Sequence, residues 1–563
     1  MSGVKYLDWF DWCVFGGMLL LSSAIGVYFA FFSKKRQDTT SEYLMGGRTM
    51  PIFPISMSLI ASYISGITLL GTPAEIYVYG SQAYMGVISD ILTNITIVIV
   101  YLPVFFKLQV TSSYEYLNRR FGPAVRLFGT CLFLIKMPIR LVNNRTVFFF
   151  FFSVTGINLH LISPIVCSVC IFYTSLGGLK AVVWADTLQM FLMMGGIVVV
   201  LIIGIVKVGG LGIVYDRAVE TSRAEFFNTD LDPTVRHTLW NMLLGNYVYH
   251  VATMAVNQCM VQRCLSVSSI RHAKWAMFIL TAGIFCIVTL CTLTGFVMHA
   301  YFFDCDPIKS KKISKADQLL PYFVMETSTI MPGLPGIFLS GVFSAALSTM
   351  STGLNSMTGV IFEDMIEPWT GGLSERATGR VLKLVVVLIG ILCVSMVFVV
   401  EQLGTLFQMT KSLLGITNGP LLGLFTLGMF FPSANAFGAL VGGITALCTM
   451  GWISLGAQSV ISKGLIKFPT KSVNVSGCKE SNLDVAMEPL YMFRISYMWY
   501  GLIGLFITIS VGLLVSNLRP DSKKVDRDLL SPVIYRFLAE DKSSSGIQSA
   551  ISPVSLKLVE MKS

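Results

Sequence analysis

The sequence predicts an all-α integral membrane protein with about thirteen transmembrane helices, ten of them arranged as two inverted five-helix repeats. Three observations predict it. The chain of 563 residues is 54% hydrophobic and only 13% charged, which is about half the charged fraction of a typical soluble protein. The apolar residues fall in runs of the ~20-residue length that a helix needs to cross a bilayer. Two of these runs are interrupted at matching places along the chain.

The apolar runs make the chain one membrane domain, so its net charge of +10 is interpreted as topology and not as nucleic-acid binding. Lys34-Lys35-Arg36, directly after the first run, should stay in the cytoplasm under the positive-inside rule. This orientation places the N-terminus outside and, after thirteen crossings, the C-terminus in the cytoplasm. The expected spans are residues 11–32, 50–78, 82–106, 124–154, 157–177, 183–208, 238–262, 274–303, 333–360, 380–401, 404–431, 434–458 and 491–516.

Four regions follow from the spans. Residues 1–49 hold an extra N-terminal helix and the first inner loop, and residues 50–431 hold the inverted-repeat core. Residues 432–517 hold two C-terminal helices with a long outer loop. Residues 518–563 are polar and lack periodicity, which predicts a disordered cytoplasmic tail.

Two interrupted spans define the core. Gly66 and Gly71-Thr72-Pro73 interrupt the span 50–78, and the span 238–262 carries Gly245 and a polar run from His250 to Gln258. Each opens a group of five spans, and an odd number per group inserts the second group upside down. Paired broken helices in inverted repeats are typical of the leucine-transporter fold. Irregular backbone at that depth is tolerated only where it lines a cavity, so we expect a binding site between the two breaks.

The apolar stretch 339–355 carries hydroxyl groups on one face. Ala345, Ser348 and Thr349 stand at i, i+3 and i+4, which places them together on a helix. Two hydroxyls and a backbone carbonyl can replace the water shell of sodium, and polar groups inside a bilayer usually mark a path for an ion or solute. The alternative is that these hydroxyls bond to carbonyls one turn back or join helices together.

Most of the twelve cysteines lie within spans, where they act as small apolar residues. Cys305 and Cys478 fall in predicted outer loops and could form an extracellular disulfide. Asn474 begins a glycosylation sequon in the long outer loop. The chain has no nucleotide-binding loop, HExxH motif or nucleophilic serine elbow, so we expect a protein that is not an enzyme.

Several segments resemble the sodium/solute symporter family, and they recur in order over most of residues 5–520. The GTPAE and FSAALST forms look most like the branch that handles small organic anions, namely monocarboxylates, iodide and vitamins such as biotin and pantothenate. The matching segments are SEYLMGGRTM (41–50), SLIASYISGITLLGTPAEIYVYG (58–80), YEYLNRRFG (114–122), FYTSLGGLKAVVWADTLQ (172–189), VNQCMVQR (256–263), DQLLPYFVME (317–326) and PGLPGIFLSGVFSAALSTMSTGLNSM (332–357).

The resemblance implies a sodium site on these two helices. Its ligands would be the backbone carbonyls of Ala61, Ile64 and Ala345 and the hydroxyls of Ser348 and Thr349. The spacing agrees, because the carbonyls of Ala61 and Ile64 can face one point if the helix opens after them.

The resemblance also implies a carboxylate, Asp186, at the inner end of its span, where it would guide sodium out or close an inner gate. The alternative is a surface-facing acid beside Lys180.

In this fold the solute lies between the two broken helices. The side chains expected to contact it are Ser65, Thr68, Tyr247, His250 and Thr253. His250 lies well inside a span, where histidines are functional candidates, although it could instead cap the broken backbone.

The segment 136–145 departs from the family, because Lys136, Arg140 and Arg145 fall near mid-depth. Each cation there costs roughly 2.5–3.5 kcal/mol on insertion scales. The cations either form an anion-attracting stretch of the pathway or mark a damaged or wrongly predicted segment. Asp90, near mid-depth in the preceding span, could pair with one of them.

Together these features predict a plasma-membrane symporter that imports a small organic anion, with a monocarboxylate as the leading solute and sodium as the transported coupling ion. A vitamin or iodide transporter, or a non-coupled channel or sensor of the same fold, is the alternative. The expected partners are the solute and the lipid bilayer, and the sequence does not address the oligomeric state.

Overall fold

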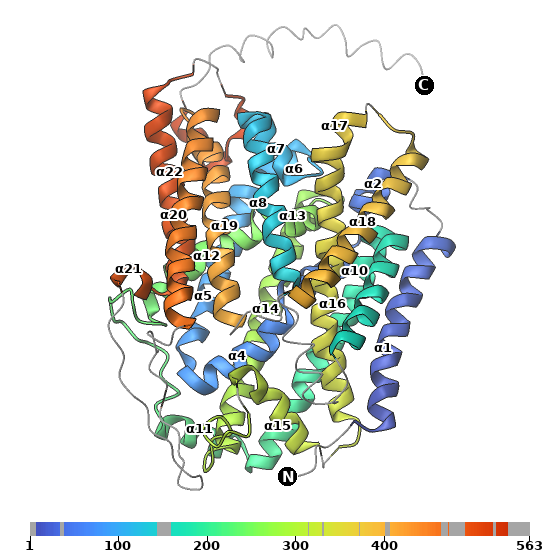
Figure 1. Cartoon of the computed structure of the whole chain (residues 1–563), viewed down its shortest axis with the longest axis vertical. Coiled ribbons are helices and arrows are strands. Elements are labelled where there is room, and N and C mark those ends of the chain that lie inside the picture. The colour runs from blue at the N-terminus through green and yellow to red at the C-terminus, as the bar shows by residue number, and fades with distance from the viewer. Residues whose placement is uncertain are drawn as a thin grey trace, which may run out of the picture.

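The protein is described by a computed structural model, and all of its regular elements in the described residues are helices. Their long axes run mostly along the longest dimension of the molecule (Figure 1). The described residues are 7–33, 39–142, 159–313, 315–328, 331–370, 372–399, 406–462, 471, 490–521 and 525–538.

Eight described helices are long and apolar enough to cross a membrane, or nine if one bent pair counts as a single span. This is fewer than the thirteen predicted spans, for identifiable reasons. Two predicted spans, 157–177 and 183–208, are joined in one helical element, α10 (Leu159–Val208), which bends at Gly178. Another, 238–262, is divided into short helices. The other counted spans are the stretch Ser81–Leu108 and those that contain α1 (Trp9–Val27), α14 (Ile270–Tyr301), α16 (Leu334–Ile361), α18 (Glu375–Val399), α20 (Ala436–Ser462) and α22 (Tyr500–Leu518). Two further long helices, α8 (Pro123–Val142) and α19 (Leu406–Phe430), stand outside this count.

Short helices connect or extend the long ones. They are α2 (Thr40–Met45), α5 (Gly86–Thr96), α6 (Leu102–Leu108), α7 (Ser113–Phe121), α11 (Leu211–Glu220), α15 (Leu319–Thr327), α17 (Glu367–Thr370) and α21 (Tyr491–Arg494).

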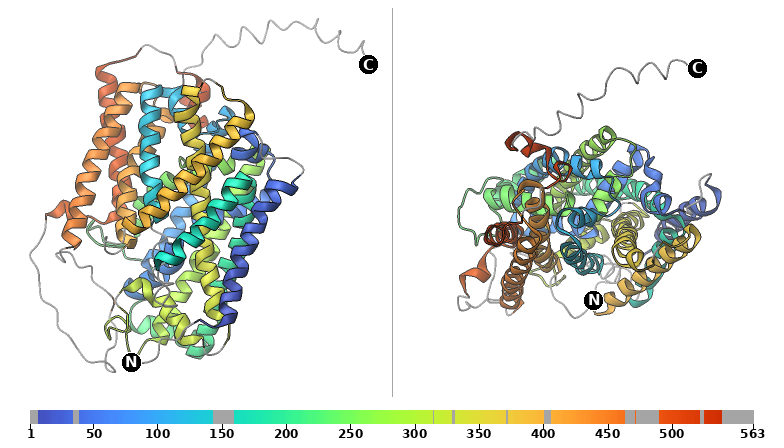
Figure 2. Two further views of the ribbon diagram at one scale, coloured as in Figure 1. Left: turned by 45° about the vertical axis from the view of Figure 1, so that its right-hand side comes forward. Right: turned by 90° about the horizontal axis from the view of Figure 1, so that it is seen from above.

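Helix α16 lies at the centre of the bundle. In the 18-residue apolar stretch of the span that contains α16, 94% of the residues are buried. In the corresponding stretches of the other seven spans, between 22% and 44% of the residues are buried. Helix α16 packs against α1, α3 (Ile52–Tyr63), α10 and α18. Helix α1 stands at one edge of the bundle and α20 and α22 at the opposite edge (Figures 1 and 2). The hydroxyl groups of α16 therefore face protein and not lipid.

The first broken helix consists of α3 (Ile52–Tyr63) and α4 (Gly66–Tyr79), which are bent by 51° relative to each other. Ile64 leaves the helix with ψ 112°, and Ser65 caps α4 by accepting a hydrogen bond from the amide of Thr68. The break thus precedes Gly66, as predicted. The second predicted interruption, Gly71-Thr72-Pro73, is wrong, because α4 continues through Pro73. Neighbouring helices often support a proline inside a membrane helix.

The second broken helix begins with a π-helical turn (Asn241–Gly245) and α12 (Asn246–Met254). The backbone is irregular at 255–257, and α13 (Gln258–Cys264) follows. Asn257 caps α13 through its side-chain oxygen. The predicted interruption between His250 and Gln258 is confirmed, whereas Gly245 lies inside a helical turn.

Gly178 makes the bend that divides α10 into its two predicted spans. Its φ of 53° and ψ of −150° belong to a region that side chains larger than glycine avoid. A Cβ atom built there would lie 2.7 Å from the backbone oxygen of Tyr43. The bend therefore depends on glycine, both for its dihedral angles and for the close approach of α2.

Gly178→Ala is accordingly expected to destabilise the protein by roughly 1–3 kcal/mol from the backbone strain alone, with the contact to Tyr43 adding to it. Gly195→Ala on the same helix is the matched control, because a Cβ there meets nothing within 4 Å. Thermal unfolding of the purified variants measures the difference. Equal melting temperatures for the two variants would contradict the role given to Gly178.

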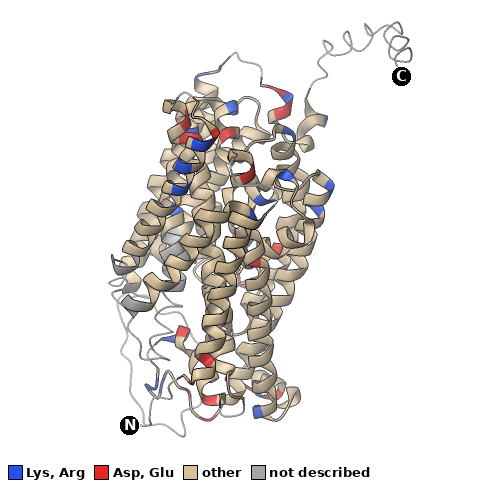
Figure 3. Ribbon diagram, turned by 90° about the vertical axis from the view of Figure 1, so that its right-hand side faces the viewer, with Lys and Arg blue, Asp and Glu red and all other residues tan. Residues whose placement is uncertain are grey.

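Charged residues are concentrated towards the two ends of the bundle, and the middle of the ribbon is mostly uncharged (Figure 3). This distribution fits a membrane-spanning protein, because charges at mid-depth are costly. Charged residues in the middle of the bundle are therefore candidates for a functional role.

Part of the stretch predicted as a disordered tail is ordered. Residues 525–538 form two 3-10 turns that pack on the core. The amide of Ser531 donates to the carbonyl of Met429 (3.0 Å), and the hydroxyl of Tyr116 donates to the carbonyl of Leu529 (3.0 Å). The sequence did not predict this packing, because the segment has low periodicity and its contact with the core depends on a few backbone hydrogen bonds. Residues 539–563 lie outside the described residues.

Candidate sodium and solute sites

The break between α3 and α4 faces the hydroxyl-bearing side of α16. The hydroxyl of Ser62 lies 2.8 Å from that of Thr352 and 3.4 Å from that of Ser348. Ala61 and Ile64 occupy the end of α3, where helix geometry leaves backbone carbonyls without partners in the helix. Both residues are fully buried. The structure thus brings the two predicted halves of the sodium site together.

The three predicted residues on α16, Ala345, Ser348 and Thr349, are buried as well. The hydroxyl of Thr349 donates to the carbonyl of Ala345 (2.9 Å), which is the one-turn-back bond named above as the alternative. That bond uses the hydroxyl proton and leaves oxygen lone pairs. The hydroxyl oxygen therefore remains able to act as a ligand for a cation.

Asp186 lies beside this region, completely buried. Its carboxylate is 2.9 Å from Nη2 of Arg263 and accepts hydrogen bonds from Ser58 (2.6 Å), Ser62 (3.4 Å) and Ser351 (3.4 Å). Arg263 is 1% exposed and also donates to Thr352. A buried ion pair needs further hydrogen bonds to both groups. The hydroxyls of α3 and α16 supply several of them, while Nε of Arg263 has no hydrogen-bond partner among the described residues.

The alternative reading of Asp186 as a surface acid beside Lys180 is wrong. Lys180 instead pairs with Glu42. Arg263, Ser58 and Ser62 were not among the residues predicted for this site. The spacing of these serines by four residues was a usable signal, because it places both hydroxyls on one face of α3.

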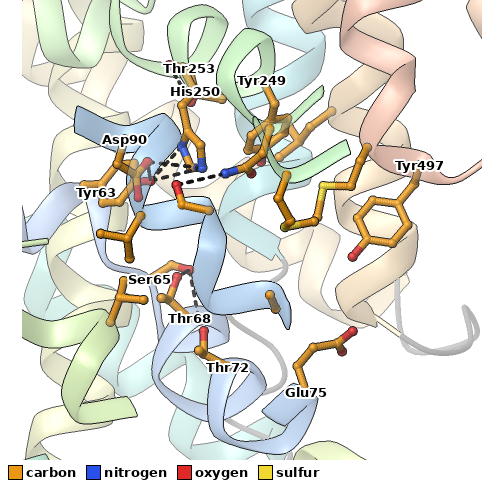
Figure 4. A pocket seen from close by; sticks show the side chains of 18 of the residues that line it. Tyr63, Ser65, Thr68, Thr72, Glu75, Asp90, Tyr249, His250, Thr253 and Tyr497 are labelled. Carbon is orange, nitrogen blue, oxygen red and sulfur yellow. Dashed lines mark hydrogen bonds and ion pairs between the residues drawn. The ribbon is translucent and has the colours of Figure 1, made fainter. Parts of the chain in front are cut away.

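A cavity of about 200 Å³ lies between the two broken helices. Four of the five predicted solute contacts line it: Ser65 and Thr68 at the start of α4, and His250 and Thr253 on α12 (Figure 4). Tyr247 does not line it, because its hydroxyl lies 2.8 Å from that of Thr96 on α5. Apolar lining comes from Ala83, Val87, Met242, Val288, Leu414 and Met498.

One wall of the cavity is a cluster of Tyr63, Asp90 and His250 (Figure 4). The hydroxyl of Tyr63 lies 2.7 Å from Nδ1 of His250 and 3.2 Å from Oδ1 of Asp90. Nε2 of His250 lies 3.3 Å from the same carboxylate. The imidazole of His250 therefore contacts two other side chains of the cavity wall.

Lys136 of α8 also lines the cavity and is 1% exposed. Its ammonium donates to Oδ1 of Asn418 on α19 (2.9 Å). Lys136 and Asp90 thus face the same cavity. The backbone of Arg140 lies in α8, while its side chain and residue Arg145 are outside what the structure describes.

A second charged cluster closes the other end of the cavity. Glu75 on α4 forms two contacts with Arg236 (2.7 and 3.2 Å), and His237 lies 3.4 Å from the same carboxylate. The guanidinium of Arg236 stacks on Tyr79 at 4.2 Å. Burial raises the pKa of Asp317 in the 3-10 turn Ala316–Gln318 before α15, and the nearby Glu75 raises it further.

The predicted disulfide and the predicted glycosylation site involve residues that the structure does not describe. Cys305 is disulfide-bonded, and its predicted partner Cys478 lies outside the described residues, as does the predicted glycosylation site Asn474.

Comparisons with known proteins agree with this architecture. The model of the sodium:solute symporter family matches residues 43–446. Sodium-coupled monocarboxylate transporter 2 of Mus musculus is 37% identical over 558 residues, covering 95% of this chain and 88% of the relative. Sodium-coupled monocarboxylate transporter 1 of Homo sapiens is 35% identical, covering 90% and 86%. A putative sodium-dependent multivitamin transporter of Drosophila melanogaster is 36% identical with the same coverage.

Among solved structures, a substrate-bound, outward-open Na⁺-coupled sialic acid symporter matches with a TM-score of 0.75 and 24% identity, covering 92% of this chain and 99% of that one. This similarity shows a shared fold. The matched relatives are transporters and not enzymes, and they span nearly the whole chain. The chain therefore belongs to the sodium:solute symporter family.

Proposed function

We propose that this protein couples the inward flow of sodium to the uptake of a small organic anion, a monocarboxylate-type solute, across the plasma membrane. One observation carries the proposal. The single break between α3 and α4 borders the hydroxyls of α16 through Ser62 and the solute cavity through Tyr63 and Ser65. An ion and a solute bound to one hinge bias the same conformational equilibrium, so each raises the affinity for the other.

The sodium site would consist of the carbonyls of Ala61, Ile64 and Ala345 and the hydroxyls of Ser348 and Thr349. Oxygen ligands of this kind suit a hard cation. The contact between Ser62 and Ser348 supports the assignment, because it brings the two helices within hydrogen-bonding distance.

Asp186 would act on the release of sodium. Its carboxylate is linked to Ser62 and Ser351, so it lies next to the proposed ion site, and Arg263 holds it in place. Rearrangement of this pair would open a polar exit for the ion.

A short monocarboxylate is the favoured solute. The cavity of about 200 Å³ is smaller than the roughly 300–1,000 Å³ of pockets for drug-sized ligands. A short carboxylate fits this size better than biotin or pantothenate. The vitamin and iodide alternatives are kept as outcomes of the test below.

Around this site we propose a core of ten helices in two inverted repeats within a total of thirteen. The N-terminus would lie outside and the C-terminus in the cytoplasm. A disulfide between Cys305 and Cys478 and a glycan on Asn474 would then both lie on the outer face. Paired breaks in α3–α4 and α12–α13 support the repeat.

Uptake by oocytes that express the protein at the surface tests the proposal. With sodium present, we expect lactate and nicotinate to accumulate above equilibrium and to evoke inward current. Replacement of sodium by choline should abolish both, and biotin and pantothenate should be taken up poorly. Solute that equilibrates without accumulating would instead identify a non-coupled channel or sensor. Preferred uptake of vitamins or iodide would redirect the solute assignment.

A further inference from the structure

Lys136 is the one lysine or arginine among the described residues that line the cavity. We infer that its ammonium binds the carboxylate of the solute, so that Lys136 is the anion anchor of this transporter and Asn418 positions it. This inference rests on the proposed function, since it concerns the same cavity. It assigns a role to a residue in the segment where the sequence departs from its family.

The placement of Lys136 supports a role in binding. The side chain is 1% exposed, and Nζ is held by Oδ1 of Asn418, which is itself fully buried. A lysine already held by a defined partner has little rotamer freedom left to lose, so ligand binding costs less conformational entropy. An ammonium has three donors, so it can serve a ligand oxygen while it is held by the protein.

The amide group of Asn418, the partner of Lys136, carries a second donor, although Asn418 is not itself among the residues that line the cavity. Its Nδ2 is buried and has no hydrogen-bond partner within the described parts of the chain. A buried donor without a partner costs about 1–3 kcal/mol. A carboxylate has two oxygens, so one that reaches Lys136 could accept from both groups and remove that cost.

The charges around the cavity favour an anion that enters together with sodium. Glu75 is balanced by Arg236, and Asp90 offsets Lys136 within the cavity wall. An anionic solute alone would leave a net negative charge in a poorly solvated space, which is costly. A sodium ion bound at the same hinge supplies the compensating positive charge, so the pair enters without net charge.

The surroundings of Lys136 define the class of solute. One fixed cation matches one carboxylate, and Val87, Val288 and Leu414 offer an apolar surface to a short tail. A second carboxylate would meet either these apolar groups or Asp90. The expected ligand is thus a short monocarboxylate, and dicarboxylates and neutral amides of the same size should bind poorly.

Binding to the purified full-length protein in sodium buffer tests the inference with nicotinate and nicotinamide, which differ chiefly in charge. The Lys136→Gln variant should bind nicotinate about ten- to a hundredfold more weakly than wild type, because it loses a charge-assisted hydrogen bond. Nicotinamide binding should stay within a few-fold, and Lys136→Arg should keep much of the preference for nicotinate. Lys107→Gln is the matched control, because Lys107 lies at the surface and pairs with Asp528.

Chemical restoration of the cation provides a second test. Lys136→Cys should lose nicotinate binding and regain it after reaction with 2-aminoethyl methanethiosulfonate, which rebuilds a lysine-like ammonium. Wild type treated in the same way controls for the native cysteines.

Three results would overturn the inference. The first is wild-type nicotinate affinity in a folded Lys136→Gln protein. The second is equal loss of both ligands together with a lower melting temperature, which would make Lys136 structural. The third is a wild-type protein that binds no carboxylate. A wild type that binds nicotinate through Lys136 without accumulating it would instead contradict only the proposed function.

Discussion

Arg263→Ala is expected to remove most of the folded protein from the cell surface. The substitution leaves the carboxylate of Asp186, which is 0% exposed, without its cationic partner. Removing one member of a buried ion pair typically costs about 3–5 kcal/mol, a large fraction of the 5–15 kcal/mol that stabilises an average domain. Asp186→Ala should be equally harmful, because it leaves the Arg263 guanidinium buried without its anion.

The double variant Asp186→Asn/Arg263→Gln distinguishes a charge effect from a loss of packing. It removes both charges, keeps the approximate volume, and should recover much of the thermal stability that either alanine variant loses. If Asp186 also takes part in sodium release, the double variant will fold but transport slowly. Arg271→Ala is the control, because Arg271 is exposed at the start of α14. Single variants as stable as wild type would show that the pair is not needed for folding.

Ser348→Ala/Thr349→Ala is expected to abolish sodium coupling while the protein still folds. The substitutions remove two of the five proposed oxygen ligands from the centre of the molecule. Each lost contact to a charged group is worth about ten- to a hundredfold in affinity. The sodium concentration for half-maximal uptake should therefore rise by at least tenfold, or uptake should vanish.

Folding should be little affected, because the hydroxyl of Thr349 bonds only within its own helix among the described contacts and that of Ser348 meets Ser62 at the long distance of 3.4 Å. Ser340→Ala is the matched control. Ser340 lies on the same helix, is fully buried and bonds one turn back to Gly336 (2.8 Å), yet it has no place in the proposed site. Sodium titrations of uptake and melting curves compare the two proteins. An unchanged titration in the double variant would remove Ser348 and Thr349 from the site.

Local patterns in the sequence correctly predicted which residues share a face when those residues lie on one helix. The spacing of Ala345, Ser348 and Thr349 predicted a shared face, and the structure places that face against the end of α3. The interruption near Gly66 was located within two residues. The prediction from glycine and proline composition alone failed at Pro73, because α4, which packs against α14, continues through this residue.

The partners across the molecule were beyond the sequence. Ser58 and Asp186 are 128 residues apart, and Lys136 and Asn418 are 282 apart. No periodicity relates such positions, because their contact depends on how α3, α8, α10 and α19 pack together.

The sequence by itself determined the membrane-spanning helical fold, the two broken helices and the hydroxyl face of α16. Each of these follows from hydropathy or from helical spacing within one segment. Only the tertiary structure decided that Asp186 is buried against Arg263, that Tyr247 faces α5, and that Lys136 lines the solute cavity. The physical reason is that burial and charge pairing belong to the space between helices, and that space exists only once the helices have packed.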